Sequence, residues 1–295
     1  VCFQVLCDLF GTEIWWHWPE QDPARAKAIA SDYEEEKDFA RWLQWLCEKQ
    51  WEFIRIYADE RNVKLMGDIP IGVSLSSADV FFERHLFDTE WCGGAPAEGS
   101  YAEDPFTAKW GQNWGIPLYR WDVMAQDNFA WWRRRVKYCT KIFSMYRIDH
   151  ILGFYRIYSF PWKPTENGVF LPLSTDQAAQ RTGGRLPGFK PRGDDNAADR
   201  NMNLADGDLY LRLLLSAASA WWGKTWAAFR TTCARTCASW ISPVSKFPTG
   251  KSRRTEPLRP EKSITNAPLR RSERMISKPS CRHGTTATRK SNAPA

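Results

Sequence analysis

A short segment near the middle of the chain carries the residue types that polar catalysis uses. It reads Arg147-Ile148-Asp149-His150 and closes an apolar run. Side chains alternate along a strand, so Arg147 and Asp149 point to the same side. A guanidinium on that side keeps a carboxylate ionised and oriented at neutral pH. Asp149, at the carboxyl end of a buried strand, is therefore well placed to be a nucleophile. The plainer alternative is a salt-bridged strand end without chemistry.

The elements that position Asp149 can be predicted from hydrophobic spacing. Residues 143–149 read as a strand, and a helix before it is predicted by apolar residues spaced 3, 4, 3 and 4 apart: Phe129, Trp132, Val136, Cys139 and Phe143. Val63 to Met66 reads as an earlier buried strand that runs into Asp68. The order strand, loop, helix, strand predicts a βαβ unit with a parallel sheet. Asp68 and Asp149 then lie at the carboxyl ends of their strands, where a (β/α) barrel keeps its chemistry.

Further segments extend this α/β reading. Residues 37–58 have apolar residues at helical spacing with charges between them, which predicts a helix. Residues 74–120 are rich in Gly, Pro, Ser and Asp and read as a long structured loop, the kind that is usually functional. Residues 181–188 read as a flexible loop. Asp206 is expected to cap a helix that continues to about Ala218.

The charge of the chain is divided near residue 220. Residues 1–220 hold 25 Lys and Arg against 31 Asp and Glu, a net charge of −6. Residues 221–295 hold 16 against 3, a net charge of +13. The basic character of the whole chain therefore belongs to its last part, and whole-chain charge is a poor guide to partners. That part has no Asp or Tyr, only two Leu and one Val, and seven Pro. It cannot bury enough apolar surface to fold alone, and we predict disorder over 221–295.

Composition limits the other function classes. No stretch approaches the roughly 20 apolar residues of a membrane span, so we expect no membrane partner. The first residues lack a basic region before an apolar run, and we read them as a fragment start rather than a signal peptide. Eight scattered cysteines without a secretory signal are typical of reduced thiols, so we expect a cytoplasmic protein. The C-x3-C and C-x-H spacings of Cys233, Cys237, Cys281 and His283 are poor for zinc, and no metal is expected.

Three motifs resemble one known family. They are Gly67-Asp68-Ile69-Pro70-Ile71-Gly72-Val73, then Gly111-Gln112-Asn113-Trp114-Gly115-Ile116-Pro117-Leu118-Tyr119, then Arg147-Ile148-Asp149-His150 with Gly153-Phe154 following. In this order they are similar to the 4-α-glucanotransferases, also called amylomaltases or disproportionating enzymes, of glycoside hydrolase family 77. The resemblance runs from about Phe10 to about Ala218. It implies a (β/α)₈ barrel of the α-amylase type, here partial and truncated at its N-terminus.

The resemblance also implies roles for the residues. Asp149 is implied to be the nucleophile that forms a covalent β-glucosyl-enzyme, with Arg147 as its charge partner. His150 and Asp68 are implied to hold sugar hydroxyls. A loop that lines the donor site is implied for Gln112, Asn113 and Trp114. The expected reaction is a retaining double displacement on maltodextrin or starch-derived α-1,4-glucans, without a cofactor. Retention needs two carboxyl groups roughly 5–5.5 Å apart, one as nucleophile and one as acid/base.

Two motifs of that family are missing after Asp149. One is Gly-Glu-Asp-Leu-Gly, whose glutamate is implied to be the acid/base, and the other is Thr-His-Asp. Trp221-Trp222-Gly223-Lys224-Thr225-Trp226 stands where the first is expected. Read from one nucleotide earlier, the codons of this segment permit Val-Val-Gly-Glu-Asp-Leu. The same shift permits Phe-Lys-Ile-Pro-His-Trp-Glu from 245–251 and Thr-His-Asp from 273–276. We therefore hypothesise that residues 221–295 are a frame-shifted, non-native tail after a partial catalytic barrel, residues 1–220, and that the chain as written is inactive.

Two alternatives remain at this stage. An α-glucan hydrolase of the α-amylase type would use the same nucleophile, although the Gln112-Asn113-Trp114-Gly115 segment favours the transferase. A protein of another class would bind nucleic acid through the basic tail. The basic pairs Arg253-Arg254 and Arg270-Arg271 are short and scattered, so we expect no nucleic-acid partner.

Overall fold

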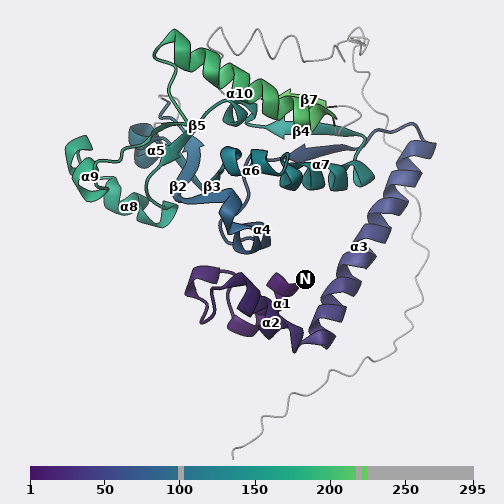
Figure 1. The fold of residues 1–295 in the computed structure, drawn as a ribbon. Helices are drawn as coiled ribbons and strands as arrows, with labels where there is room; N and C mark the ends of the chain where they lie inside the picture. The colour runs from purple at the N-terminus through teal and green to yellow at the C-terminus, as the bar shows by residue number, and fades with distance from the viewer. Residues whose placement is uncertain (99–102, 217–220, 225–295) are drawn as a thin grey trace, which may run out of the picture. The chain divides into compact units, whose positions relative to one another are not determined.

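The computed structural model describes residues 1–98, 103–216 and 221–224 (Figure 1). The chain divides into two units, 1–245 and 246–295, and only the first contains described residues. Helices and strands alternate in it, which confirms an α/β protein. No helix among the described residues combines the length and the apolarity needed to cross a bilayer.

The first 60 residues are helical. The elements are α1 (Cys2–Phe10), η1 (Trp15–His17), α2 (Pro23–Ser31) and α3 (Glu34–Glu60). Helix α1 ends at Gly11, whose φ of 72° is the left-handed conformation that glycine adopts at little cost. Helix α2 begins after Asp22, whose carboxylate accepts from the backbone N–H groups of Ala24 and Arg25.

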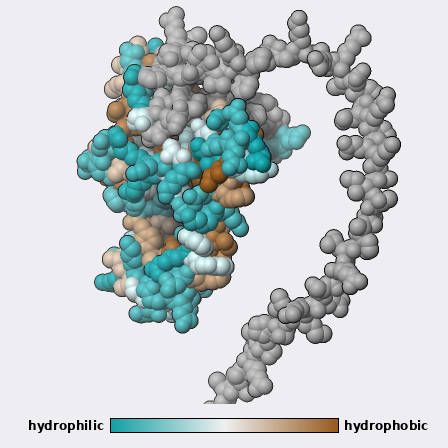
Figure 2. All heavy atoms as spheres, turned by 90° about the vertical axis from the view of Figure 1, so that its right-hand side faces the viewer, coloured by the Kyte–Doolittle hydropathy of each residue, from teal (hydrophilic) through white to brown (hydrophobic). Residues whose placement is uncertain are grey.

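Helix α3 confirms the helix predicted over 37–58, and most of its large apolar side chains are exposed. Among its large apolar side chains, Phe39 is 60% exposed and Phe53 is 68% exposed. Only Lys37 and Ala58 are buried on this helix. Figure 2 looks at the side of the molecule on which α3 lies in Figure 1, and brown residues are visible there between teal ones. The period was therefore correct, and no described element covers much of this face.

The two strands predicted to end at Asp68 and Asp149 lie in one parallel sheet. Its strands lie in the order β1 (Met66–Ile69), β4 (Met145–Asp149) and β7 (Trp221–Lys224). The parallel pairing of β1 with β4 confirms the βαβ prediction. Helix α7 (Ala130–Ile142) precedes β4 and buries Trp132 and Val136, as its spacing predicted. The first strand begins three residues later than expected, and Val63 and Met66 are each 52% exposed, so the 63–66 segment is not a buried strand.

The prediction of a long loop over 74–120 is wrong. This segment forms α4 (Ala78–Phe82), η2 (Arg84–Leu86), β2 (Phe87–Ala95), α5 (Pro105–Trp110) and β3 (Gln112–Tyr119). Strands β2 and β3 join β5 (Ile157–Phe160) and β6 (Gly188–Lys190) in an antiparallel sheet of order β3-β2-β5-β6. Glycine and proline suggested a loop, but Gly93 and Gly94 lie inside the ladder and pair with β5.

The remaining elements lie between the strands along the chain. They are α6 (Trp121–Gln126), η4 (Ile151–Phe154), η5 (Pro164–Glu166), α8 (Asn167–Phe170), α9 (Thr175–Arg181) and α10 (Ala197–Ser216). Asp206 does not cap a helix as predicted. It lies inside α10, which begins at Ala197. Within the predicted loop over 181–188, Arg181 ends α9 and Gly188 begins β6.

Two hydrophobic clusters stabilise these layers. The larger one includes Phe81, Trp132, Ile148 and Phe154, and lies around the parallel sheet. The smaller one includes Phe160, Trp162 and Phe170, and lies around the antiparallel sheet. Among the described residues six tryptophans are buried, and all of them belong to these clusters: Trp15, Trp18, Trp110, Trp131, Trp132 and Trp162.

The predicted tail is described at four residues only. Trp221–Lys224 form β7, so the expectation that no regular structure follows residue 220 does not hold for them. The predicted disorder of 225–295, the zinc spacing and the basic pairs lie outside the described residues.

Candidate active site

Strands β1 and β4 bring three predicted site residues to one face of the parallel sheet. Asp68 lies opposite Arg147 in the register. Tyr146 and Ile148 alternate with Arg147 and are 2% exposed, so the other face of β4 is core. Strand alternation therefore places Arg147 and Asp149 together on the open face, as the sequence predicted.

Arg147 binds Asp68 more closely than it binds Asp149. Its Nε donates to Oδ1 of Asp68 at 2.9 Å, and its Nη2 donates to Oδ2 of the same carboxylate. This two-point contact is the geometry that guanidinium and carboxylate prefer. The hydrogen bond to Asp68, and then the charges of Asp68 and Asp149, raise the pKa of Arg147. Arg147 thus interacts with Asp149 through charge, as its implied role as charge partner requires, while Asp68 accepts its hydrogen bonds.

Asp149 has an unusual environment for a strand-end carboxylate. Its Oδ1 is buried and has no hydrogen-bond partner among the described residues. Buried polar atoms are normally paired, and an exception calls for an explanation such as a catalytic role. In the parallel pairing of β4 with β7, Asp149 lies opposite position 224. Asp149 therefore has one hydrogen-bond acceptor, Oδ1, that no described residue occupies.

His150 follows Asp149 in a left-handed backbone conformation, with φ of 49°. Few non-glycine residues adopt it, and such strain is concentrated at functional sites. Burial lowers the pKa of His150 from 6.5, and the charge of Asp149 opposes that shift. The imidazole is therefore neutral at pH 7. Gly153 makes room for it, because a Cβ there would lie 3.1 Å from Cδ2 of His150.

The Gln112-Asn113-Trp114 segment reaches the site from the second sheet. These residues begin β3 and do not form a loop, which corrects that part of the prediction. The ring of Trp114 meets that of His150 edge to face, with centroids 4.8 Å apart at 87°. Nε1 of Trp114 donates to Oε1 of Gln112 at 3.0 Å. Trp114 is 38% exposed, so part of its ring is open to a ligand.

Asn113 is directed away from the site. Its Nδ2 donates to the carbonyl of Trp162 at 3.0 Å and to Oδ1 of Asn167 at 3.3 Å. Its Oδ1 accepts from the N–H of Gly115 at 3.2 Å. The amide is thus used within the protein, and the geometry does not support its implied role in lining the donor site. Asn167 is a residue that sequence reasoning missed, because nothing in the local sequence links it to a residue 54 positions earlier.

The contacts join six of the seven predicted residues in a row. Asp68 binds Arg147, Arg147 lies beside Asp149, and His150 follows and touches Trp114, which binds Gln112. The arrangement offers a carboxylate with a free oxygen, a neutral imidazole, an ion pair and an aromatic ring. These are groups that take hydroxyls and the apolar face of a sugar. Among the described residues, no group of three or more His, Cys, Asp or Glu is placed to hold a metal.

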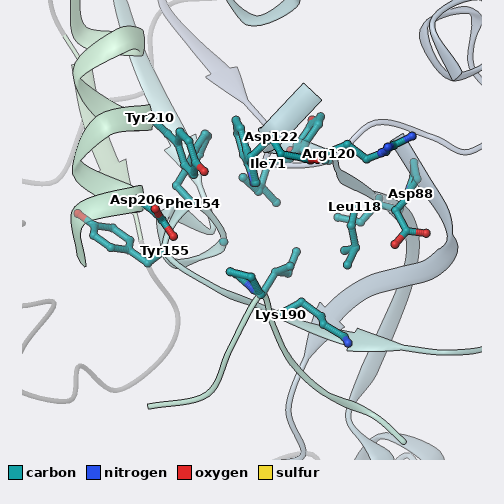
Figure 3. Close-up of a pocket in the computed structure, with 18 residues that line it drawn as sticks. Ile71, Asp88, Leu118, Arg120, Asp122, Phe154, Tyr155, Lys190, Asp206 and Tyr210 are labelled. Atoms are coloured by element: carbon teal, nitrogen blue, oxygen red, sulfur yellow. The ribbon is translucent and has the colours of Figure 1, made fainter. Parts of the chain in front are cut away.

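A cavity of about 320 Å³ lies next to this row but does not include it (Figure 3). Ile71 and Gly153 line it, and both also lie close to each other beside His150. On the wall formed by α10, Asp206 and Tyr210 are one helical turn apart. None of the seven predicted residues lines the cavity. We base the site on the row of contacts, because the free carboxylate oxygen and the strained histidine lie there.

The chain is similar to known proteins of one family. A family model described as 4-alpha-glucanotransferase (Glyco_hydro_77) matches residues 1–247. The chain belongs to this family. A 4-alpha-glucanotransferase of Chlamydia caviae is 34% identical over 158 residues, which cover 53% of this chain and 28% of that protein. One of Streptococcus pneumoniae serotype 4 is 31% identical over 193 residues, 64% of this chain and 36% of that protein. The chain therefore spans about a third or less of the length of these family 77 relatives.

A solved structure gives the same fold. The amylomaltase from Streptococcus agalactiae, in complex with acarbose, superposes with a TM-score of 0.58 at 20% identity. The superposition covers 81% of this chain and 43% of that one. At 20% identity the likeness shows that the two chains share a fold, and the acarbose is a property of the solved structure alone.

Proposed function

We propose that this chain carries the nucleophile half of a 4-α-glucanotransferase site for α-1,4-glucans. The observation that carries the proposal is Asp149, at the carboxyl end of β4, with a buried oxygen that no described residue binds. Membership of family 77 supports the reaction class. The same comparisons favour a transferase over the α-glucan hydrolase alternative, because the matched relatives are named as glucanotransferases.

The proposed reaction is a retaining double displacement. A carboxylate oxygen of Asp149 attacks the anomeric carbon of the donor while the glycosidic C–O bond breaks. The departing oxygen takes a proton from an acid on a neighbouring strand. The 4-hydroxyl of an acceptor glucan then attacks the same carbon and gives its proton to the deprotonated acid. The bond between this carbon and Asp149 breaks, which releases the carboxylate. Retention needs the two carboxyl groups roughly 5–5.5 Å apart.

The other residues of the row bind and orient the donor. The Asp68–Arg147 pair and neutral His150 take hydroxyls of the sugar at the cleaved bond. Trp114 offers an open ring to the apolar face of a pyranose, and Gln112 keeps its amide nitrogen for a hydroxyl while its oxygen accepts from the indole. We no longer assign a direct sugar contact to Asn113.

The register of β7 supports the frame-shift hypothesis. The acid/base glutamate codon of the shifted frame straddles Gly223 and Lys224, and position 224 pairs with Asp149. Adjacent strands are about 4.8 Å apart, and residues in register in a parallel pair share a face. A glutamate at this point would therefore meet the spacing that a retaining mechanism needs. We extend the proposal to a partial (β/α)₈ barrel over 1–220 followed by a frame-shifted segment over 221–295.

Sequencing the coding DNA tests the frame directly. The expected result is that the frame one nucleotide earlier spells Gly-Glu-Asp-Leu-Gly at 223–227 and Thr-His-Asp near 274–276. Any other reading at these two places rejects the frame shift. The reaction class is tested separately, by incubating maltotriose with the 295-residue chain and with a frame-restored chain that includes the upstream region. We expect longer maltooligosaccharides from the restored chain only. Asp149→Asn in the restored chain should lower the rate of their formation by at least about 10³-fold.

Maltodextrins or starch-derived glucans are the proposed donors and acceptors, in the cytoplasm. Nucleic-acid binding through 225–295 concerns residues outside the described part of the chain. Steeply salt-dependent DNA binding by the whole chain would favour it.

A further inference from the structure

The start of β3 contains a bulge that carries Trp114. Ile116 pairs with Gly93 and Asn113 pairs with the next residue of β2, Gly94. Trp114 and Gly115 therefore lie outside the ladder, as two extra residues on β3. Gly115 has φ of 70°, and a Cβ there would lie 2.8 Å from Cγ of Pro164. Bulges next to active sites re-aim a side chain, and this one directs Trp114 to His150.

The bulge is held by hydrogen bonds from one cluster of side chains. Oδ1 of Asn113 accepts from the N–H of Gly115 and so closes the bulge from inside. Nδ2 of Asn113 reaches the carbonyl of Trp162 and Oδ1 of Asn167. Oδ1 of Asn167 also accepts from Nε1 of Trp162 at 3.2 Å. One amide oxygen of Asn167 thus receives two donors and links β3 to α8.

The cluster is anchored in the smaller hydrophobic core. The ring of Trp162 stacks on that of Phe170 at 3.9 Å and 4°. Trp110 donates from its Nε1 to the carbonyl of Phe170 at 3.1 Å. These contacts are buried, so they hold Asn167 and the carbonyl of Trp162 in fixed positions, whereas the ring of Trp114 is partly open.

We infer that Asn113 and Asn167 are positioning residues, which fix the Trp114-Gly115 bulge and so place the Trp114 ring against His150. The functional meaning of this placement rests on the proposed function, because Trp114 and His150 are the proposed sugar contacts. Neither asparagine touches the sugar. Asn167 acts through Asn113, and Asn113 acts through the backbone of Gly115. The requirement at position 167 is an acceptor oxygen, since both of its hydrogen bonds here are accepted by Oδ1.

The test reads the ring contact in the 295-residue chain itself, so it does not depend on turnover. The chain has four histidines, and the imidazole ¹H–¹³C resonances of His150 are identified by their loss in His150→Gln. Trp114→Ala measures the full ring-current shift on His150. We expect Asn167→Ala to remove most of that shift, and Asn167→Asp, which keeps the acceptor at equal size, to retain it. Asn201→Ala, an exposed asparagine on α10, is the matched control and should leave the shift unchanged.

A second variant covers the case in which Asn167→Ala does not fold, which the amide spectrum reveals. Asn113→Asp keeps the oxygen that accepts from Gly115 but replaces the donating nitrogen at equal volume. It should also remove the shift. The inference is overturned if Asn167→Ala folds and His150 keeps its shift, if Asn113→Asp keeps it, or if Trp114→Ala does not move it. Glucan transfer can fail in all of these chains without affecting the result.

Discussion

Asp149 can be distinguished from an ordinary ion-paired carboxylate by its hydrogen bonds. Its buried Oδ1 has no partner among the described residues, whereas Asp194 forms an ion pair with Arg156 at 2.9 Å and accepts from Asn203 at 3.1 Å. A buried polar atom without a partner costs about 1–3 kcal/mol of stability, and a paired one contributes to it. Sites of catalysis often keep such unfavourable groups at the expense of stability.

Removal of the Asp149 carboxylate should therefore leave the protein as stable as before or more stable. We expect Asp149→Ala to raise the free energy of unfolding by up to about 1 kcal/mol, or to leave it unchanged. Asp194→Ala, the control, should lower it by about 1–2 kcal/mol. Urea denaturation of the full chain measures both. A loss at Asp149 as large as that at Asp194 would favour the structural alternative for Asp149.

His150 should make stability depend on pH below neutrality. Burial lowers the pKa of His150 in the folded state below 6.5, the value it has in the unfolded chain. Below pH 6.5 the unfolded state binds a proton that the folded state does not, so stability falls as the pH falls through that value. Above it the contribution is fully present. Unfolding free energies between pH 7.5 and roughly 5 should show this loss, and His150→Gln should remove that component of the slope.

At the scale of single residues, the sequence predicted the side of a strand on which a side chain lies better than it predicted the hydrogen-bond partner of that side chain. Alternation placed Arg147 and Asp149 on one side of β4, and that is what the structure has. The hydrogen bonds of Arg147 go to Asp68, which comes from another strand, and only the β1–β4 register determines that contact. Asn113 and Asn167 are likewise brought together by tertiary structure, so no local pattern could have linked them.

At the scale of elements, the packing of β1 depends on one glycine. A Cβ on Gly67 would lie 2.3 Å from Cδ2 of Phe143, the residue just before the turn into β4. The ring of Phe143 therefore lies directly on the backbone of β1, next to Asp68. No side chain fits there without movement of the ring or the strand.

Gly67→Ala should consequently lower stability by about 1–3 kcal/mol, which is the usual cost of overpacking. Gly188→Ala is the matched control, because Gly188 is also in a strand and a Cβ there meets nothing within 4 Å. We expect no loss from it, and a small gain since glycine is unfavourable in strands. Thermal unfolding of the two variants gives the comparison, and equal melting temperatures would contradict the close approach.

Elements with a clear period were predicted, and those with many glycines were not. Helix α7 and strand β4 follow 3.6- and 2-residue spacing with no interruption. Strands β2 and β3 contain glycines and a two-residue bulge, which hide the alternation. Asp206 looked like a cap because it precedes an apolar run, but α10 already begins nine residues earlier. Turn-forming residues inside elements are thus the main reason for the errors.

At the scale of the whole molecule, α3 carries most of the large apolar side chains that are exposed in the described part of the chain. Its aromatic residues follow the helical period that normally marks a buried face, and yet Trp42 is 51% and Trp45 is 53% exposed. Exposed apolar patches of this kind commonly mark an interface or a liability for aggregation.

The α3 face should bind a hydrophobic dye. We expect the full chain to enhance anilinonaphthalene sulfonate fluorescence, and the double change Phe39→Ser and Phe53→Ser to lower it by about half. Leu209→Ser, at a residue 49% exposed on α10, is the control for an isolated apolar side chain and should have little effect. An unchanged signal in the double variant would mean that the dye binds elsewhere.

Strand β7 has a consequence for how such a chain would behave beside an intact relative. It joins β4 through main-chain groups, and the ladder of a parallel pair forms whichever side chains follow it. Under the proposed function, a polypeptide that completes this edge without a proton donor keeps the groups that bind an oligosaccharide and lacks the acid that allows its release as product. It would act as a competitor that sequesters short glucans, visible as occupancy without chemical change.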